Sequence, residues 1–426
     1  MNAHGPAQNP HRDNSAGRFS GAALSCGAYL EGETATMSTA VHRFTPEFAP
    51  YTVELLRNRL ENTRFPEPET VEDWSQGIPL SYVQELVTYW QADYDMERAI
   101  QALNQWPNYK THIDGHDIHF IQQRSEHTAA TPLLLTHGWP GSVLEFRHVI
   151  DRLTNPTAHG GRPEDAFHVV MPSLPGYGFS GKPRAPGTGV HRIAELWIQL
   201  MERLGYPQFV AHGGDWGALV TQAIATTENT PCLAIHITLP VVAPDTDTLD
   251  NPLPEEVRAL EAFNYYQDWD SGYSKQQSTR PQTLGYGLAD SPTGQLAWII
   301  EKYAQWCDCE VNGIRHPENA LPRDELLDTV MLYWMTNSAA SSARLYWESF
   351  NTPDMSEVSL PTGISLFPNE IFRSSERWAR NKFRELVYFN DQIAKGGHFS
   401  ALEVPQTLSE ELWRWRTALR TQGILQ

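Results

Sequence analysis

The residues with the clearest chemical potential lie in one short turn, Gly213-Gly214-Asp215-Trp216-Gly217. An apolar segment at residues 209–212 precedes this turn, and a segment with helical character follows it. Glycines on both sides of Asp215 indicate a tight strand-to-helix turn, the nucleophile elbow, where the backbone is too crowded for side chains. Such a turn holds its central side chain clear of the sheet and leaves helix-start amides free to stabilise an anion. The pattern predicts that Asp215 is a nucleophile.

An aspartate at this position, which usually holds serine, narrows the class of reaction. Serine needs a base to take its proton before it attacks an acyl carbon. A carboxylate is already ionised at neutral pH and can displace a leaving group at a saturated carbon, which gives an alkyl ester of the enzyme. Esters and amides are therefore poor substrate candidates, whereas epoxides and alkyl halides are good ones. The alternative is that Asp215 only caps the following helix.

A second glycine-rich loop, His137-Gly138-Trp139-Pro140-Gly141, follows the apolar residues 133–136. In folds with such an elbow, a loop of this kind supplies one backbone N–H of an oxyanion hole, and the residue after the nucleophile supplies the other. The predicted donors are therefore the backbone amides of Trp139 and Trp216. The simpler alternative is a Gly-Pro turn that only joins a strand to a helix.

The base is expected near the C-terminus, because the order of the triad along such a chain is nucleophile, acid, histidine. The motif Gly396-Gly397-His398-Phe399 lies there, after the apolar residues 387–389. Of the 16 histidines, His398 has the expected position and flanking glycines, so it is the predicted base.

The acid is expected after the preceding strand. Residues 363–367 lead into Pro368-Asn369-Glu370, which makes Glu370 the predicted acid. Its role would be to fix the imidazole tautomer and to stabilise the imidazolium. Glu376 and Asp391 remain alternatives.

The elements that must position these residues alternate between short apolar strands and helices. The predicted strands cover residues 133–136, 168–171, 209–212, 235–239, 364–367 and 387–389. Helical stretches at 190–204 and 218–227 lie between them. This alternation favours an α/β fold with a mainly parallel sheet and helices on both faces.

Upstream of the sheet, apolar residues recur at helical spacing over residues 53–60 and again over 81–103. Residues 109–113 and 116–122 then alternate around Asp114-Gly115, which predicts a hairpin with a type I′ turn. These segments form a predicted N-terminal arm followed by the first hairpin of the sheet.

The interval from Pro240 to about Pro361 contains no convincing strand, only aromatic-rich helical segments at 296–306 and 326–350. An insertion of this kind predicts a helical lid across the carboxyl ends of the strands, where open α/β sheets place their ligands. The predicted divisions are a flexible extension (1–41), the arm and hairpin (42–130), the first part of the core (131–240), the lid (241–360) and the second part of the core (361–426).

Composition limits the partners and the compartment. The formal net charge of −19 is repelled by phosphate backbones and anionic lipids, so no nucleic acid and no membrane surface is expected as a partner. The four cysteines do not form a disulfide framework, which favours a reducing compartment, and Cys307 and Cys309 have no second cluster that would suggest a metal. No segment approaches the ~20 apolar residues needed to span a bilayer, so we expect a cytoplasmic protein.

Together these motifs resemble those of the microsomal-type branch of epoxide hydrolases in the α/β-hydrolase superfamily. The resemblance extends from about residue 42 to the C-terminus. Besides the turn around Asp215, it rests on 106–110, 115–120, 137–142, 172–180, 367–370 and 396–399. It implies an α/β-hydrolase fold, conversion of an epoxide to a diol, and no metal or organic cofactor. Membrane-bound relatives carry an N-terminal anchor, and residues 1–36 lack the apolar run for one.

The resemblance also implies two lid tyrosines whose hydroxyls bind the epoxide oxygen. Ser271-Gly272-Tyr273-Ser274 matches the first and Ser342-Ala343-Arg344-Leu345-Tyr346 the second, so the role is carried to Tyr273 and Tyr346. An alkoxide is a poor leaving group unless a donor neutralises it as the C–O bond breaks. The substitutes, should either assignment fail, are Tyr265, Tyr266 and Tyr333.

Two other functions compete with this hypothesis. A hydrolytic dehalogenase would use the same Asp nucleophile, with Trp216 as a halide-binding group, and a catalytically silent binding scaffold would keep only the fold. The paired tyrosines favour a small-molecule epoxide as the substrate. The aromatic residues of the lid suggest that this substrate is apolar or aromatic. We also expect a role in detoxification. The arm has two options, to clasp its own lid or that of a second copy in a homo-oligomer.

Overall fold

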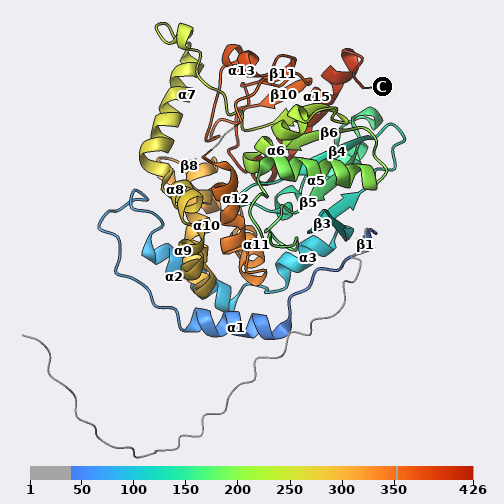
Figure 1. The fold of residues 1–426 in the computed structure, drawn as a ribbon. Helices are drawn as coiled ribbons and strands as arrows, with labels where there is room; N and C mark the ends of the chain where they lie inside the picture. The colour runs from blue at the N-terminus through green and yellow to red at the C-terminus, as the bar shows by residue number, and fades with distance from the viewer. Residues whose placement is uncertain (1–39, 352–353, 426) are drawn as a thin grey trace, which may run out of the picture. The chain divides into compact units, whose positions relative to one another are not determined.

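The computed structural model describes residues 40–351 and 354–425. Within this part of the chain, nine strands form one sheet in the order β1-β2-β3-β5-β4-β6-β7-β10-β11 (Figure 1). Pairing is antiparallel from β1 to β5 and parallel from β5 to β11. The strands are β1 (His42–Arg43), β2 (Asn108–Ile113), β3 (His116–Gln123), β4 (Thr131–Thr136), β5 (Phe167–Pro172), β6 (Phe209–Gly213), β7 (Cys232–Ile237), β10 (Thr362–Ser365) and β11 (Leu386–Asn390).

The predicted α/β architecture is confirmed, because each predicted strand overlaps an observed one. Strands β4, β6 and β7 form the buried centre of the sheet, and nearly all of their residues are inaccessible to solvent. Such strands bury side chains on both faces, which is why they appear in the sequence as continuous apolar runs. The predicted hairpin is also confirmed: at the turn between β2 and β3, Asp114 and Gly115 have φ values of 45° and 83°, as a type I′ turn requires.

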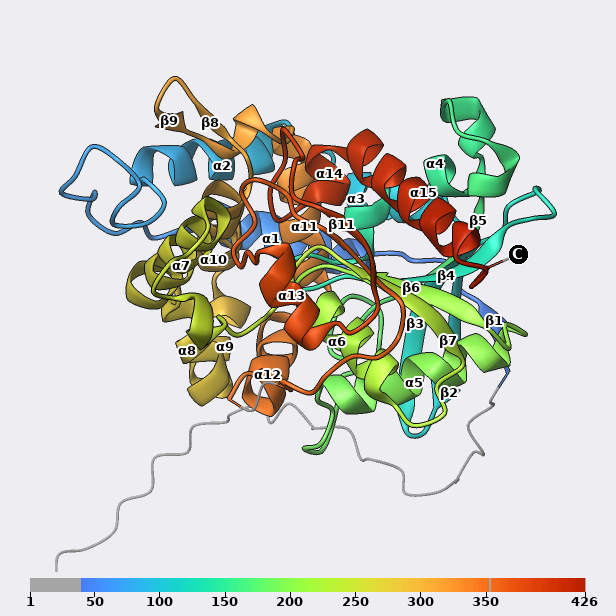
Figure 2. The ribbon, with the colours of Figure 1, turned by 90° about the horizontal axis from the view of Figure 1, so that it is seen from above.

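Helices cover both faces of the sheet. Figure 2 shows α5 and α6 on one side of the strands and α4 and α15 on the other. The bounds of these four helices are α4 (Ile150–Thr154), α5 (Val190–Arg203), α6 (Asp215–Thr226) and α15 (Pro405–Thr421). Helix α6 contacts β4, β6 and β7, and therefore its first residue lies at the carboxyl ends of the central strands.

The interval between β7 and β10 is mostly helical, as predicted. Figures 1 and 2 show its helices gathered on one side of the sheet. They are α7 (Pro254–Tyr265), a π-helical turn η5 (Tyr266–Asp270), α8 (Gly272–Thr279), α9 (Pro281–Asp290), α10 (Pro292–Trp306), α11 (Arg323–Met335) and α12 (Ala339–Ser349).

Two details of this interval correct the sequence interpretation. The single helix predicted over 326–350 is two helices, because the chain turns at Asn337, whose φ is 50°; asparagine adopts this left-handed conformation more readily than most residues. The interval also contains a short hairpin, β8 (Glu310–Val311) and β9 (Ile314–Arg315), where no strand was expected. Strands of two residues are too short to leave an alternating pattern in the sequence.

The segment before the hairpin contains three helices, α1 (Pro50–Glu61), α2 (Leu80–Ala92) and α3 (Arg98–Asn104). The helix predicted over 81–103 is therefore interrupted, because the Asp95 side chain accepts a hydrogen bond from the Glu97 amide at 3.0 Å and so competes with helical backbone bonding. Tyr82, Tyr89 and Tyr94 donate hydrogen bonds to three carboxylates of the interval between β7 and β10, Glu318, Asp324 and Asp328. These bonds tie the N-terminal helices to that interval.

Residues 1–39 of the predicted extension lie outside the described residues. In the part that the structure describes, no helix is both long enough and apolar enough to cross a membrane.

Candidate active site

Asp215 lies at the first residue of α6, directly after β6, and its φ of 48° is unusual for a residue with a side chain. The glycines around it are sterically required. A Cβ on Gly217 would lie 1.8 Å from the carbonyl oxygen of Thr136, and one on Gly213 would lie 2.2 Å from the backbone of Gly217. The sharp turn therefore exists because β4, β6 and the start of α6 approach more closely than any side chain allows.

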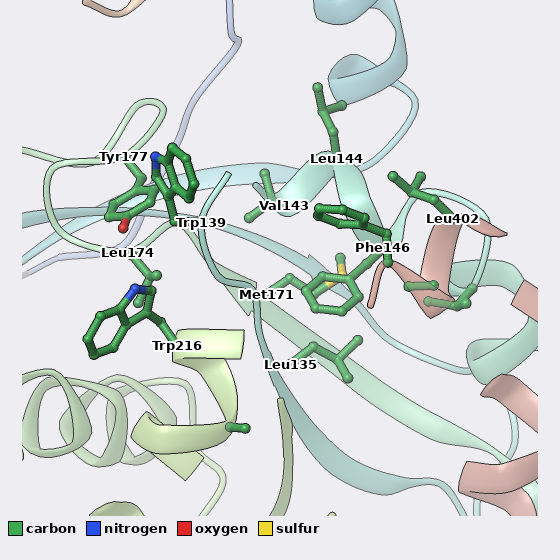
Figure 3. Close-up of a cluster of buried hydrophobic side chains, with 14 of the residues drawn as sticks. Leu135, Trp139, Val143, Leu144, Phe146, Met171, Leu174, Tyr177, Trp216 and Leu402 are labelled. Atoms are coloured by element: carbon green, nitrogen blue, oxygen red, sulfur yellow. The ribbon is translucent and has the colours of Figure 1, made fainter. Parts of the chain in front are cut away.

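The loop after β4 brings a backbone donor to Asp215. The Trp139 amide donates to Asp215 Oδ1 at 2.7 Å, and a Cβ on Gly138 would lie 2.0 Å from the same oxygen. Trp216 is the second residue of α6. The first backbone N–H groups of a helix have no acceptor within the helix, so the Trp216 amide is free to bind an anion. Figure 3 shows Trp139 and Trp216 on the same side of the buried cluster, with Trp216 on the first turn of α6.

His398 lies between two carboxylates. Its Nδ1 is 2.6 Å from Glu370 Oε1, and its Nε2 is 3.4 Å from Asp215 Oδ2. The His398 side chain is 2% exposed and that of Glu370 is fully buried. Burial by itself would lower the pKa of His398, but Glu370 and Asp215 outweigh it and raise the pKa well above its usual value.

The weaker candidates for the acid lie elsewhere. Glu376 is on the surface of α13 (Glu376–Lys382), where it pairs with Arg380, and Asp391 accepts a hydrogen bond from Gln392. Among the described carboxylates, Glu370 is the one that lies against the Nδ1 of His398.

The two predicted tyrosines approach Asp215 from the helical interval. Tyr273 is on α8 and Tyr346 on α12; both are buried, and their ring centroids are 5.7 Å apart. Tyr273 stacks on Trp139 at 5.1 Å, and Tyr346 meets Trp216 edge-on at 4.8 Å. Burial, together with the charge of Asp215, raises the pKa of both phenols well above 10, so both are protonated hydrogen-bond donors. The hydroxyl of Tyr346 has no hydrogen-bond partner among the described residues.

The three alternative tyrosines, Tyr265, Tyr266 and Tyr333, differ in how close their hydroxyls lie to the Tyr273 hydroxyl. Tyr333 donates to the Gly141 carbonyl at 2.9 Å, and Tyr265 is 54% exposed. Tyr266 is buried and donates to Ser274 at 2.9 Å. Of the three, Tyr266 is the one whose hydroxyl also lies within 3.5 Å of the Tyr273 hydroxyl.

A cavity of about 440 Å³ opens onto Asp215, Tyr273 and Tyr346. Its wall comes from the core helices α5 and α6, from α7, η5, α8 and α12 of the helical interval, and from residues in and just before α13. Most of the wall is apolar, including Leu219, Leu239, Val242, Phe263, Phe350 and Phe372. A small apolar molecule inside it would lie beside one carboxylate and two phenol side chains.

Sequence reasoning missed several residues around the site. The Trp306 ring is 5.1 Å from the His398 ring, and the Trp306 carbonyl accepts the His398 amide at 3.0 Å. Asp270 and Lys302 form a buried ion pair beside Tyr273. No motif marks these positions, because each is an ordinary residue of a helix or its end. Among the described residues, no group of three or more histidine, cysteine or acidic side chains is arranged to hold a metal ion.

The fold and the elbow place this chain in the class of α/β hydrolases, and comparison with known proteins agrees. A family model described as "alpha/beta hydrolase fold" matches residues 131–288, and one described as "Epoxide hydrolase N terminus" matches residues 41–146.

Relatives extend the similarity over most of the chain. A Stigmatella aurantiaca protein assigned by name to the epoxide hydrolases is 51% identical over 84% of this chain and 80% of its own length. Epoxide hydrolase 1 of Sus scrofa is 33% identical over 90% of each chain. The crystal structure of juvenile hormone epoxide hydrolase from the silkworm Bombyx mori superposes with a TM-score of 0.84 at 30% identity, over 92% of this chain and 97% of that one. The chain belongs to the epoxide hydrolase family.

Proposed function

We propose that this epoxide hydrolase opens an epoxide with Asp215 as the nucleophile and releases a vicinal diol. The observation that carries the proposal is the convergence on one carboxylate: Asp215 meets a backbone donor, a histidine base and a pair of tyrosine hydroxyls beside an apolar cavity. Apolar walls suit a small apolar or aromatic epoxide, which would leave water to enter the cavity.

In the first step, a carboxylate oxygen of Asp215 attacks one epoxide carbon from the side opposite the C–O bond that breaks. The electron pair of that bond goes to the oxygen, which takes a proton from Tyr273 or Tyr346 while the other hydroxyl stays hydrogen-bonded to it. The product is a hydroxyalkyl ester of Asp215. Two donors at the leaving oxygen stabilise the charge that develops there, which is the main requirement for a ring opening at neutral pH.

In the second step, His398 takes a proton from water, and the hydroxide adds to the ester carbonyl carbon of Asp215. The amides of Trp139 and Trp216 hold the oxyanion, which collapses and expels an alkoxide. The alkoxide takes the proton of the carboxylic acid formed at Asp215, which releases the diol and restores the carboxylate. Glu370 accepts a hydrogen bond from Nδ1–H and so keeps the imidazole in the tautomer whose Nε2, on the side of Asp215, is free to accept a proton.

The raised pKa of His398 fits this order of steps. In the free enzyme, Glu370 and Asp215 together favour the imidazolium. Once Asp215 is esterified, one of these two negative charges is gone, and the pKa of His398 falls. The imidazolium then gives up its proton, which passes through solvent to the tyrosinate left by ring opening, and His398 becomes a base only after the ester has formed. The protonation of His398 thus depends on whether Asp215 is esterified.

The decisive test is to trap the ester. His398→Gln should still be alkylated by an epoxide but should hydrolyse the ester very slowly, so intact-mass analysis should show the protein plus one epoxide. Peptide mapping should place the adduct on Asp215. Alkylation at another residue, or no adduct across a panel of aryl and alkyl epoxides, would refute the mechanism. Halide release from haloalkanes, with no diol formed from epoxides, would instead support the dehalogenase alternative.

The finer assignments belong to the same proposal. We propose residues 241–360 as the lid, 42–130 as the arm and hairpin, and 131–240 with 361–426 as the catalytic core. We also propose that the enzyme acts in the cytoplasm, where removal of reactive epoxides would be a detoxifying activity. The hydrogen bonds from Tyr82, Tyr89 and Tyr94 favour an arm that clasps its own lid, and a homo-oligomer stays a prediction. Cell fractionation and light scattering of the purified protein test the location and the assembly.

A further inference from the structure

A buried ion cluster lies behind Tyr273, and the proposed reaction does not use it directly. The Lys302 ammonium is 2.7 Å from Asp270 Oδ1 and 2.8 Å from Glu301 Oε2, and the side chains of Lys302 and Asp270 are each 7% exposed. Burial by itself would lower the pKa of Lys302, but Glu301 and Asp270 outweigh it and raise the pKa. The lysine is therefore a buried cation.

This cation faces the ring of Tyr273. Lys302 Nζ lies 4.7 Å from the ring centroid, within the distance at which a cation is attracted to an aromatic face. The same ring stacks on Trp139 at 5.1 Å with an angle of 11° between the planes. Among the described cations, Lys302 is the one placed over this ring.

Asp270 joins the cluster to the rest of the site. Its second oxygen accepts the Trp306 indole N–H at 2.7 Å, and the Trp306 ring lies 5.2 Å from Tyr273 and 5.1 Å from His398. One carboxylate thus fixes both the cation and the indole that border Tyr273. Asp270 ends η5, only three residues before Tyr273, so the cluster and the phenol are positioned by the same turn of chain.

The electrostatics around the Tyr273 hydroxyl are otherwise unfavourable to loss of its proton. The groups that face it are Tyr346, Tyr266 and Asp215, and each disfavours a negative charge on the phenol, as does burial. Proton transfer to an epoxide oxygen nevertheless makes the phenol more negative in the transition state. A buried cation on its ring is the group that would offset this, since electrostatic interactions are strengthened where water is excluded.

We propose that Lys302 is a positioning residue for ring opening, and that its ammonium, held over Tyr273 by Asp270 and Glu301, makes the Tyr273 hydroxyl a stronger donor to the epoxide oxygen. The inference rests on the proposed role of Tyr273 as a donor. It assigns Lys302 to the first step only, because ester hydrolysis does not draw a proton from the phenol.

Single-turnover kinetics with styrene oxide test this division. Lys302→Met is one heavy atom shorter than lysine and removes its charge, and it should slow formation of the ester about tenfold while leaving ester hydrolysis within about twofold. Lys302→Arg should restore most of the rate, because the charge returns.

A double-mutant cycle separates electrostatic help from simple packing. In a Tyr273→Phe background, Lys302→Met should have almost no further effect on alkylation, since the hydroxyl on which the cation acts is gone. An equal slowing in both backgrounds, or a parallel loss in both chemical steps, would overturn the proposal. If Tyr273→Phe itself leaves alkylation unchanged, the proposed donor role fails instead, and the two failures are thus distinct.

A second variant keeps the test valid if Lys302→Met fails to fold. Lys302→Met leaves two carboxylates buried without a cation, so Glu301→Gln/Lys302→Met, which removes one of them, should be measured beside it. This double variant should keep a thermal transition near that of the wild type and show the same selective loss of alkylation. Wild-type alkylation in the folded double variant would also overturn the proposal.

Discussion

The strand ends of the sheet and the helical interval between β7 and β10 meet at the same cavity but position their residues in different ways. In the sheet, Asp215, Glu370 and His398 lie in the turns and loops after β6, β10 and β11, so strand order and backbone approach set their places. In the helical interval, Tyr273 and Tyr346 converge because α8 packs against α12. The first arrangement depends on glycines and register, the second on side-chain packing.

Because of this difference, substitutions in the two regions should affect the reaction rate differently. The turn at Asp215 has no steric freedom, since a single added Cβ would overlap neighbouring atoms, so a small change there should abolish the reaction. In the proposed reaction the two tyrosine hydroxyls share one task, and therefore loss of either should reduce the rate only partly.

The largest effect should come from the nucleophile. Asp215→Asn and Asp215→Ala should lower the rate of diol formation by roughly 10⁴-fold or more, as removal of a nucleophile does in other covalent mechanisms. Steady-state diol release measured by chromatography is a sufficient assay. The matched control is Asp151→Asn, because Asp151 is an exposed carboxylate that pairs with His159; it should keep wild-type activity. Substantial turnover by both Asp215 variants would remove the basis for the whole site.

The next effect should come from the loop that approaches the nucleophile. Gly138→Ala would bring a Cβ within 2.0 Å of Asp215 Oδ1 and displace both the carboxylate and the Trp139 amide, so diol formation should fall about 10³-fold. Gly287→Ala on α9 is the control, since no atom lies within 4 Å of the added Cβ. This control should stay active and melt no lower than the wild type, because alanine favours a helix over glycine by about 1 kcal/mol. Equal activity of the two variants would contradict the steric account.

The same contrast explains how far the sequence predicts the site. Asp215, Glu370 and His398 could be proposed from the order of strands and glycine motifs, because in a parallel sheet the carboxyl ends of neighbouring strands lie together. Tyr273 and Tyr346 came only from a resemblance to a family, since nothing in their spacing indicates that their rings meet.

Trp306, Asp270 and Lys302 were not proposed at all. The contacts that place them join residues 270 to 306 and 306 to 398, and such pairings depend on how the helices pack. The break at Asn337 was missed for a related reason: apolar residues continue on both sides of it, and periodicity does not register a single left-handed residue.

The phenol pair should show the graded effect. Tyr273→Phe and Tyr346→Phe should each slow ester formation roughly 10- to 100-fold, and the double variant should lose more than either alone. Hydrolysis of the ester should stay close to the wild-type rate, because the hydroxyls leave the reacting centre after the ring opens. Rapid-quench measurement of both steps tests the split. Tyr333→Phe serves as the control, since its hydroxyl donates to the Gly141 carbonyl. A double variant that alkylates as fast as the wild type would transfer the donor role to another group.

The smallest effect should be a pH-dependent contribution of His398 to the stability of the fold. The pKa of His398 is raised in the folded protein by Glu370 and Asp215, so its charge stabilises the fold fully below the unfolded pKa of about 6.5. That contribution is lost as the pH rises through the higher folded pKa. The wild type should therefore melt above His398→Gln by the largest margin near pH 6, and the margin should shrink by about 2–4 °C as the pH rises toward 9. Calorimetry over this range measures it, with His191→Gln as the control because that side chain is 62% exposed. A margin that grows with pH would mean that His398 is neutral in the folded protein, and the proposed coupling between the base and the esterified nucleophile would then fail.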